Sequence, residues 1–121
     1  MRDEIRRLDI DDPQVGHPDA RVRYSSDIWG WFVDGRLIMV WGVIPDTRLS
    51  DSAYLWSMFH TTVPSRRLFF LRAREVIATL REHFSRLYGF TDPGSVLMRH
   101  LGATLADRPD SGDRYYFEIL T

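Results

Sequence analysis

Apolar residues occur in short runs with polar breaks, and the spacing of these runs predicts the elements of the chain. Two apolar runs between Ile28 and Ile44 are separated by Asp34 and Gly35. This dipeptide suits a type I′ turn, because both central positions of that turn take positive φ angles. The second run is apolar on both of its alternating faces, which is typical of a strand covered on both sides. We therefore expect a β-hairpin that contributes a buried strand.

The stretch from Ala53 to Phe84 is the longest patterned segment. It reads as a strand over Ala53–Thr62, a stop at Val63, Pro64 and Ser65, and an amphipathic helix from Ser65 to Phe84. Ser65 is a plausible N-cap, since its hydroxyl can accept from a first-turn amide. The residues expected on the buried side of the helix recur at helical spacing: Phe69, Ala73, Val76, Ile77, Leu80 and Phe84.

The remaining pattern predicts a strand at Arg86–Thr91, a helix over Gly94–Leu101 and two final strands at Ala103–Ala106 and Arg114–Leu120. Asp92 and Pro93 resemble a helix start, and Gly102 a C-terminal glycine. The order is β-β-β-α-β-α-β-β, which is an α/β (α+β) fold. Residues 1–27 are polar and are interpreted as an N-terminal arm, with a helical turn at Asp3–Leu8. Residues 28–121 are expected to form a single domain.

Composition narrows the possible functions. The chain has 121 residues, no cysteine and a formal charge of -1, and all 16 basic residues are arginine. Thiolate chemistry and lysine Schiff bases are therefore excluded. The four histidines form no metal-binding pattern, so no metal site is expected. The near-neutral charge argues against nucleic-acid binding, and no apolar run is long enough for a membrane helix.

Arg66 and Arg67 stand out because two cations in the first helical turn oppose the helix dipole. They could face a bound phosphate or a partner's carboxylate, or they could simply be solvated. His60, within the predicted strand Ala53–Thr62, is the best candidate for a general base, since a neutral imidazole can accept a proton. A satisfied structural histidine is the alternative.

The order of elements, together with the run from Leu97 to Ala103, resembles the C-terminal two-thirds of the GCN5-related N-acetyltransferases (GNAT). The resemblance implies a GNAT-like central mixed, mostly antiparallel sheet flanked by two helices. A narrower resemblance, to small acetyltransferase-like phage proteins that include a short internal virion protein of short-tailed phages, rests on four motifs: Trp41-Gly42-Val43, Ala53-Tyr54-Leu55-Trp56, Leu87-Tyr88-Gly89-Phe90 and Arg99-His100-Leu101-Gly102.

The resemblance implies where a cofactor and catalytic groups would lie. In the family, a glycine-rich loop before the long helix holds the coenzyme A pyrophosphate, and here the aligned Pro64–Leu71 segment has no glycine. The corresponding cofactor-binding candidates are Val63, Ser65, Arg66 and Arg67. Met98 occupies the place of the family's proton-donating tyrosine and cannot donate. Tyr88 and Tyr54 are the candidate substitutes, with a buried structural role as the alternative, and Asp51 is a weaker candidate for the base than His60.

Two functions follow from the resemblance. The first is a non-catalytic phage protein that binds no cofactor and acts in virion structure or assembly, with other phage or virion proteins and a second copy of itself as possible partners. The alternative is a divergent acyl-CoA-dependent N-acyltransferase that uses acetyl-CoA. The four tryptophans could mark a protein interface or fill the core. Either function places the chain in the cytoplasm of a bacterial host or in the virion.

Overall fold

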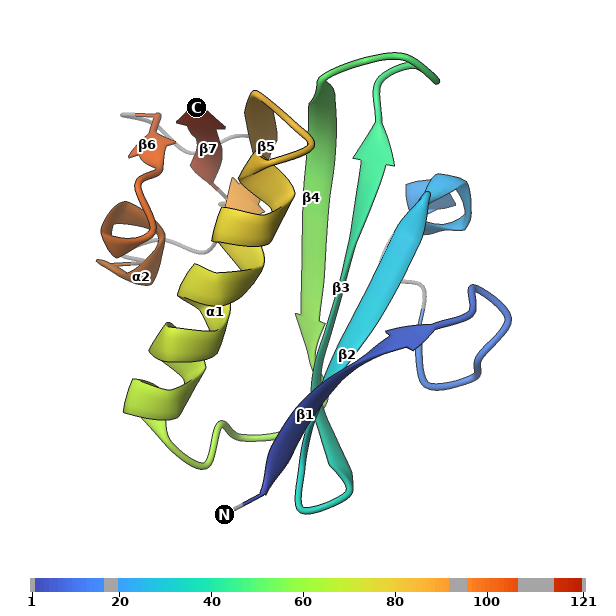
Figure 1. Cartoon of the computed structure of the whole chain (residues 1–121), viewed down its shortest axis with the longest axis vertical. Helices are drawn as coiled ribbons and strands as arrows, with labels where there is room; N and C mark the ends of the chain where they lie inside the picture. Colours follow the sequence, from blue (N-terminus) through green and yellow to red (C-terminus); the bar gives the residue numbers. More distant parts are fainter. Residues whose placement is uncertain (1, 17–19, 92–95, 107–114, 121) are drawn as a thin grey trace. The chain divides into compact units, whose positions relative to one another are not determined.

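The structure is a computed structural model that describes residues 2–16, 20–91, 96–106 and 115–120. Its elements are β1 (Asp3–Leu8), η1 (Ala20–Tyr24), β2 (Asp27–Val33), β3 (Arg36–Pro45), β4 (Ser52–Phe59), α1 (Arg66–Arg81), β5 (Arg86–Thr91), α2 (Val96–His100), β6 (Thr104–Leu105) and β7 (Tyr115–Leu120) (Figure 1). The strands form a seven-stranded sheet in the order β1-β2-β3-β4-β5-β7-β6. The predicted mixed, mostly antiparallel sheet with two helices is thereby confirmed.

The chain divides into two compact units. Unit 1 contains Met1–Pro45 and Leu55–Pro64, and unit 2 contains Asp46–Tyr54 and Ser65–Thr121. Strand β4 contributes residues to both units, because the boundary follows Tyr54. Within unit 2, β4 pairs in parallel with β5 over three positions, from Ser52 opposite Arg86 to Tyr54 opposite Tyr88.

In unit 1, the predicted hairpin is confirmed. Strands β2 and β3 pair antiparallel, and the turn residues Asp34 and Gly35 have φ angles of 51° and 80°. The prediction of a strand covered on both sides also holds, because residues on both faces of β3, among them Val40 and Trp41, are buried. Gly42 is required by packing, since a Cβ at that position would lie 2.7 Å from the Trp56 ring.

The tryptophans of unit 1 belong mainly to its core. Trp31, Trp41 and Trp56 are each at most 6% exposed. Trp29 is half-buried and stacks on Trp41 with ring centroids 6.4 Å apart. The Trp56 indole donates to the Ser25 hydroxyl over 2.8 Å. Three of these four rings therefore serve the packing of the protein itself, which weakens the argument that they form an interface.

The helical turn predicted at Asp3–Leu8 is wrong, because these residues form strand β1. The strand pairs antiparallel with β2 along its whole length, from Asp3 opposite Val33 to Leu8 opposite Ile28. Figure 1 shows β1 beside β2. This pairing with a distant segment supplies the hydrogen bonds that a local pattern could not reveal. The separation of an arm at residues 1–27 from a domain at 28–121 stays a prediction.

In unit 2, α1 begins at Arg66 with Ser65 as its N-cap, as predicted, and ends at Arg81, three residues before the predicted end. Ile77 and Leu80 are buried, and the rest of the predicted stripe is half-buried. The core of the unit also contains four buried strand residues: Ala53, Leu87, Phe117 and Ile119.

Helix α2 ends at His100, one residue before the predicted Leu101, and Gly102 follows it as the predicted C-terminal glycine with a φ angle of 90°. The amides of Gly102 and Ala103 donate to the carbonyls of Arg99 and Met98, the pattern of a Schellman motif. Strands β6 and β7 then pair antiparallel, which confirms the predicted final pair of strands. The predicted helix start at Asp92 and Pro93 lies outside the described residues, as does most of the predicted loop between the last strands.

Candidate functional site

The start of α1 holds three of the four predicted cofactor-binding residues. The Ser65 hydroxyl accepts from the Leu68 amide over 3.2 Å, and the Ser65 carbonyl accepts from the Phe69 amide over 3.0 Å. Within the described residues, the backbone amides of Arg66 and Arg67 donate to no other group, and both side chains are exposed. Two amides at the positive end of a helix, flanked by two guanidinium groups, can bind an anion.

The predicted base His60 and the predicted cofactor residue Val63 both lie in the connection that follows β4. His60 lies one residue beyond the end of β4, not within the strand as predicted, and its side chain is exposed. Its backbone amide donates to the Ile38 carbonyl over 2.8 Å. Val63, the fourth predicted cofactor residue, is half-buried in the same connection. His60 and Val63 belong to unit 1, whereas Ser65 and the arginines belong to unit 2.

Tyr88 of β5 is part of an aromatic and acidic cluster in unit 2. Its hydroxyl donates to the carboxylate of Asp46. Its ring meets the Tyr54 ring edge to face at 5.7 Å, and the Arg86 guanidinium lies 4.3 Å from its centroid. The hydroxyl oxygen keeps lone pairs that can accept a hydrogen bond from a ligand. Tyr88 is therefore the predicted catalytic candidate with a titratable neighbour.

Arg86 is the centre of a network that the sequence analysis missed. Its guanidinium donates to Glu118, to the Ser52 hydroxyl over 2.9 Å and to the Tyr116 hydroxyl over 2.6 Å. The hydrogen bond to Glu118 raises the pKa of Arg86, and burial raises the pKa of Tyr116. The charge of Arg86 is thus largely balanced by Glu118.

The clustered residues share one face of the strands in unit 2. Arg86, Tyr88 and Phe90 alternate along β5, and the cross-strand pairs place Tyr116 and Glu118 beside them. We call these five residues the polar face. The alternation of residues within β5 and β7 was a sequence signal for this face. Finding the face also required the register between β5 and β7, which lie far apart in the chain. The weaker base candidate, Asp51, accepts a hydrogen bond from Ser85 over 2.7 Å and so holds the start of β5.

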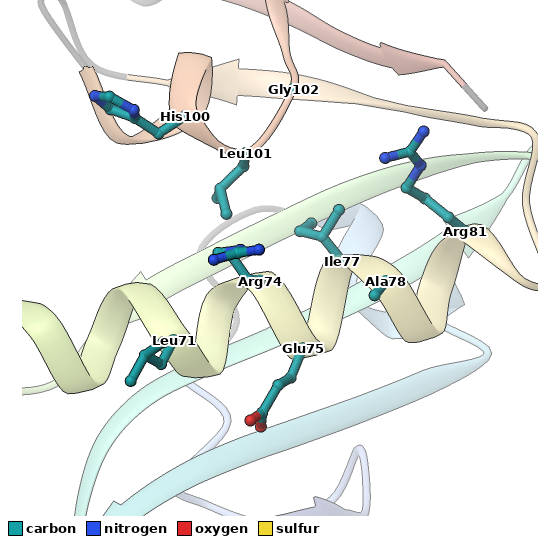
Figure 2. A pocket seen from close by; sticks show the side chains of 9 residues that line it. All are labelled: Leu71, Arg74, Glu75, Ile77, Ala78, Arg81, His100, Leu101 and Gly102. Atoms are coloured by element: carbon teal, nitrogen blue, oxygen red, sulfur yellow. The ribbon is translucent and has the colours of Figure 1, made fainter.

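A groove of about 530 Å³ runs between α1 and the end of α2, also within unit 2. Ile77 and Leu101 reach into it from opposite sides, whereas Glu75 points away (Figure 2). Arg74, Arg81 and His100 also line it, and the Arg81 guanidinium donates to the Leu120 carbonyl over 3.2 Å. The groove therefore combines apolar side chains with charged ones of both signs.

Metal-binding clusters and membrane-spanning helices are not found in the described part of the chain. Residues 2–16, 20–91, 96–106 and 115–120 contain no group of three or more His, Asp or Glu side chains placed to hold a metal ion. Neither of the described α-helices is long and apolar enough to span a membrane.

No protein-family model and no curated protein matches the chain. Solved structures do match. An IAA acetyltransferase from Bacillus cereus is 14% identical with a TM-score of 0.72, covering 99% of this chain and 100% of that one. A Bacillus subtilis acetyltransferase in complex with CoA is 7% identical with a TM-score of 0.70, covering 99% of both chains. A GNAT family acetyltransferase from Elizabethkingia anophelis with acetyl-CoA bound is 11% identical with a TM-score of 0.69, covering 98% of both.

These matches establish the fold. Each extends over almost the whole of both chains, and the proteins compared are acetyltransferases. The expected GNAT-like fold is therefore confirmed. At such low identity the likeness does not transfer an activity, which has to be argued from the residues of this chain.

Proposed function

We propose that this chain is an acyl-CoA-dependent N-acyltransferase that uses acetyl-CoA and acetylates an amine. The observation that carries the proposal is the start of α1, where two backbone amides that make no hydrogen bond to any other described residue stand beside two exposed arginines on a GNAT-like fold. Two proteins with the same fold were solved with CoA or acetyl-CoA. The N-acyltransferase, which was the alternative in the sequence analysis, is thus better supported than the non-catalytic role.

The residues at the helix start fit a diphosphate despite the missing glycines. Arg66 and Arg67 have exposed side chains, so neither is packed into the core, and the bulkier Leu68 and Phe69 are half-buried. Arg66 and Arg67 would hold the diphosphate through their amides and guanidinium groups. Ser65 would act indirectly, by fixing the first turn through its bond to the Leu68 amide.

Acetyl-CoA, when bound, would supply an activated acetyl thioester for transfer to the amine. The protein has to remove a proton from the amine, which is an ammonium ion at neutral pH. In this proposal the ammonium ion binds beside the Tyr88 hydroxyl, the Tyr88 oxygen takes one ammonium proton, and Tyr88 passes its own hydroxyl proton to the Asp46 carboxylate. Met98 of α2 has no proton to donate to the departing thiolate, so any donor must come from another residue.

Calorimetric titration with CoA tests the cofactor. We expect micromolar binding that weakens about tenfold or more in Arg66→Ala/Arg67→Ala, since each charge-assisted contact contributes more than a neutral one. Arg48→Ala is the matched control, because Arg48 is an exposed arginine in a loop of the same unit, and it should bind like the parent. The absence of binding at millimolar CoA would overturn the proposal.

Release of free CoA thiol with a panel of primary amines tests the reaction. Tyr88→Phe should lower kcat by about 100-fold, the lower range for loss of a general base or acid, without changing CoA affinity. Tyr116→Phe removes a hydroxyl from the same face and is the control that should keep most activity. A parent protein that binds CoA but acetylates no amine would refute the catalytic part alone.

The virion role, its phage partners and the cellular location stay predictions. Their strongest sequence support was the glycine-free turn, since the tryptophan argument is weakened by the burial of three rings. Failure to bind CoA would make that role the better explanation of the chain.

A further inference from the structure

The outer edge of β1 has a charge pattern that matches itself. β1 is the last strand on its side of the sheet, and among the described residues only β2 pairs with it. In its sequence, Asp3 and Glu4 precede Ile5, and Arg6 and Arg7 follow it. Exposed edge strands are available for pairing with another chain unless something blocks them. In β1 the charges favour one way of pairing with another strand, and they do not prevent pairing altogether.

We propose that β1 pairs antiparallel with β1 of a second copy of this chain, around a two-fold axis at Ile5. In that register Glu4 faces Arg6 of the partner subunit on one face of the sheet, and Asp3 faces Arg7 of the partner subunit on the other. Ile5, which is 37% exposed, faces Ile5 of the partner subunit on the axis. Opposite charges directly across two strands stabilise the pair. The result is a closed dimer with an isologous interface.

The same charges disfavour the neighbouring arrangements. A two-fold axis at Glu4 would place two carboxylates opposite each other, and one at Arg6 would oppose two guanidinium groups. Parallel pairing in register would set every charge against its own kind. The alternating pattern therefore specifies both the direction and the register of pairing.

The contacts that these side chains make within one chain are compatible with pairing to a second copy. Glu4 and Arg6 form an ion pair of 3.1 Å within the strand, with side chains 57% and 50% exposed. Such exposed pairs are weak. The Arg6 guanidinium also lies 3.7 Å from the Phe32 ring centroid, which keeps it on the same face of the sheet as Glu4. Asp3 accepts from the Trp31 indole and Arg7 contacts Asp27, and both bonds fix the side chains on the face that contains Ile5. This inference does not depend on the proposed enzyme activity.

Sedimentation of charge variants tests the interface. The parent should dimerise, and Glu4→Arg or Arg6→Glu alone should weaken dimerisation about tenfold or more, because each gives strands of like charge. An equimolar mixture of these two variants should recover the dimer, since the arginine introduced in one variant then faces the glutamate introduced in the other. Circular dichroism verifies that each variant is folded. A monomeric parent at about 0.5 mM, or a dimer indifferent to both variants, would overturn the proposal.

A single introduced cysteine tests the axis itself. The chain has no cysteine, so Ile5→Cys provides a unique thiol. Mild oxidation should produce a disulfide-linked dimer, because facing positions of an antiparallel pair bring Cβ atoms within reach of a disulfide. Leu49→Cys, at a position 97% exposed in a loop, is the matched control and should cross-link far more slowly. Equal rates for the two variants would contradict a two-fold axis at Ile5.

Discussion

The two faces of the β5 and β7 pair in unit 2 differ in what they contribute. On one face, Leu87, Phe117 and Ile119 are at most 3% exposed and form a dry core. On the other, Arg86 and Glu118 are about one-third exposed and are connected by hydrogen bonds. The same backbone supports both, so the comparison isolates side-chain chemistry. The apolar face holds the fold, and the polar face contains Tyr88, the catalytic residue of the proposed function.

The largest effect should follow from opening the apolar face. Leu87→Ala removes a side chain with 0% exposure and should lower the free energy of unfolding by about 3 kcal/mol, from lost burial plus the remaining cavity. Leu120→Ala is the matched control, because Leu120 belongs to the same strand pair and is 61% exposed. It should change stability by less than about 0.5 kcal/mol. Urea unfolding of both variants measures the difference, and equal effects would erase the distinction between the faces.

A smaller effect should follow from breaking the polar network. Arg86→Met removes three hydrogen bonds and leaves Glu118 without its cation, but water reaches both sites. We expect a loss of about 1 kcal/mol in unfolding free energy. In Arg86→Met/Glu118→Leu much of that loss should be recovered, because no unpaired charge remains. A loss as large as that of Leu87→Ala would show that the polar face is part of the folding core.

The smallest effect concerns alkaline pH. Burial raises the pKa of Tyr116 above its ordinary value of 10.0, so the folded protein retains a proton that the unfolded chain releases. The stability from this group is complete below pH 10 and is lost as pH rises through the folded pKa. Thermal unfolding between pH 8 and 11 should therefore show a decline that is shallower in Tyr116→Phe. A steeper decline in that variant would reverse the sign of the argument.

Local signals made much of the fold predictable. The Asp34 and Gly35 turn, the Ser65 cap and the Gly102 terminus each act within a few residues, and all three are found in the structure. Strand β1 was missed because it has few apolar residues and is stabilised by pairing with β2. The end of β4 was placed too late, so His60 was assigned to the strand.

The site was predictable only where its parts are adjacent in sequence. Ser65, Arg66 and Arg67 were identified because a helix start and its charges can be read from consecutive residues. Tyr88 is 42 residues away in sequence from its partner Asp46, and Arg86 is 32 residues away from its partner Glu118. Such contacts depend on strand order and register, which a single sequence does not fix.

The most direct test of the proposed function is a titration of isotope-labelled protein with CoA, followed through its backbone amide resonances. The account predicts that the Arg66 and Arg67 amides shift among the most strongly at micromolar CoA. The Leu68 amide, already bonded to the Ser65 hydroxyl, should shift less. The absence of shifts at the start of α1 at millimolar CoA would contradict the central claim that this helix start binds the cofactor.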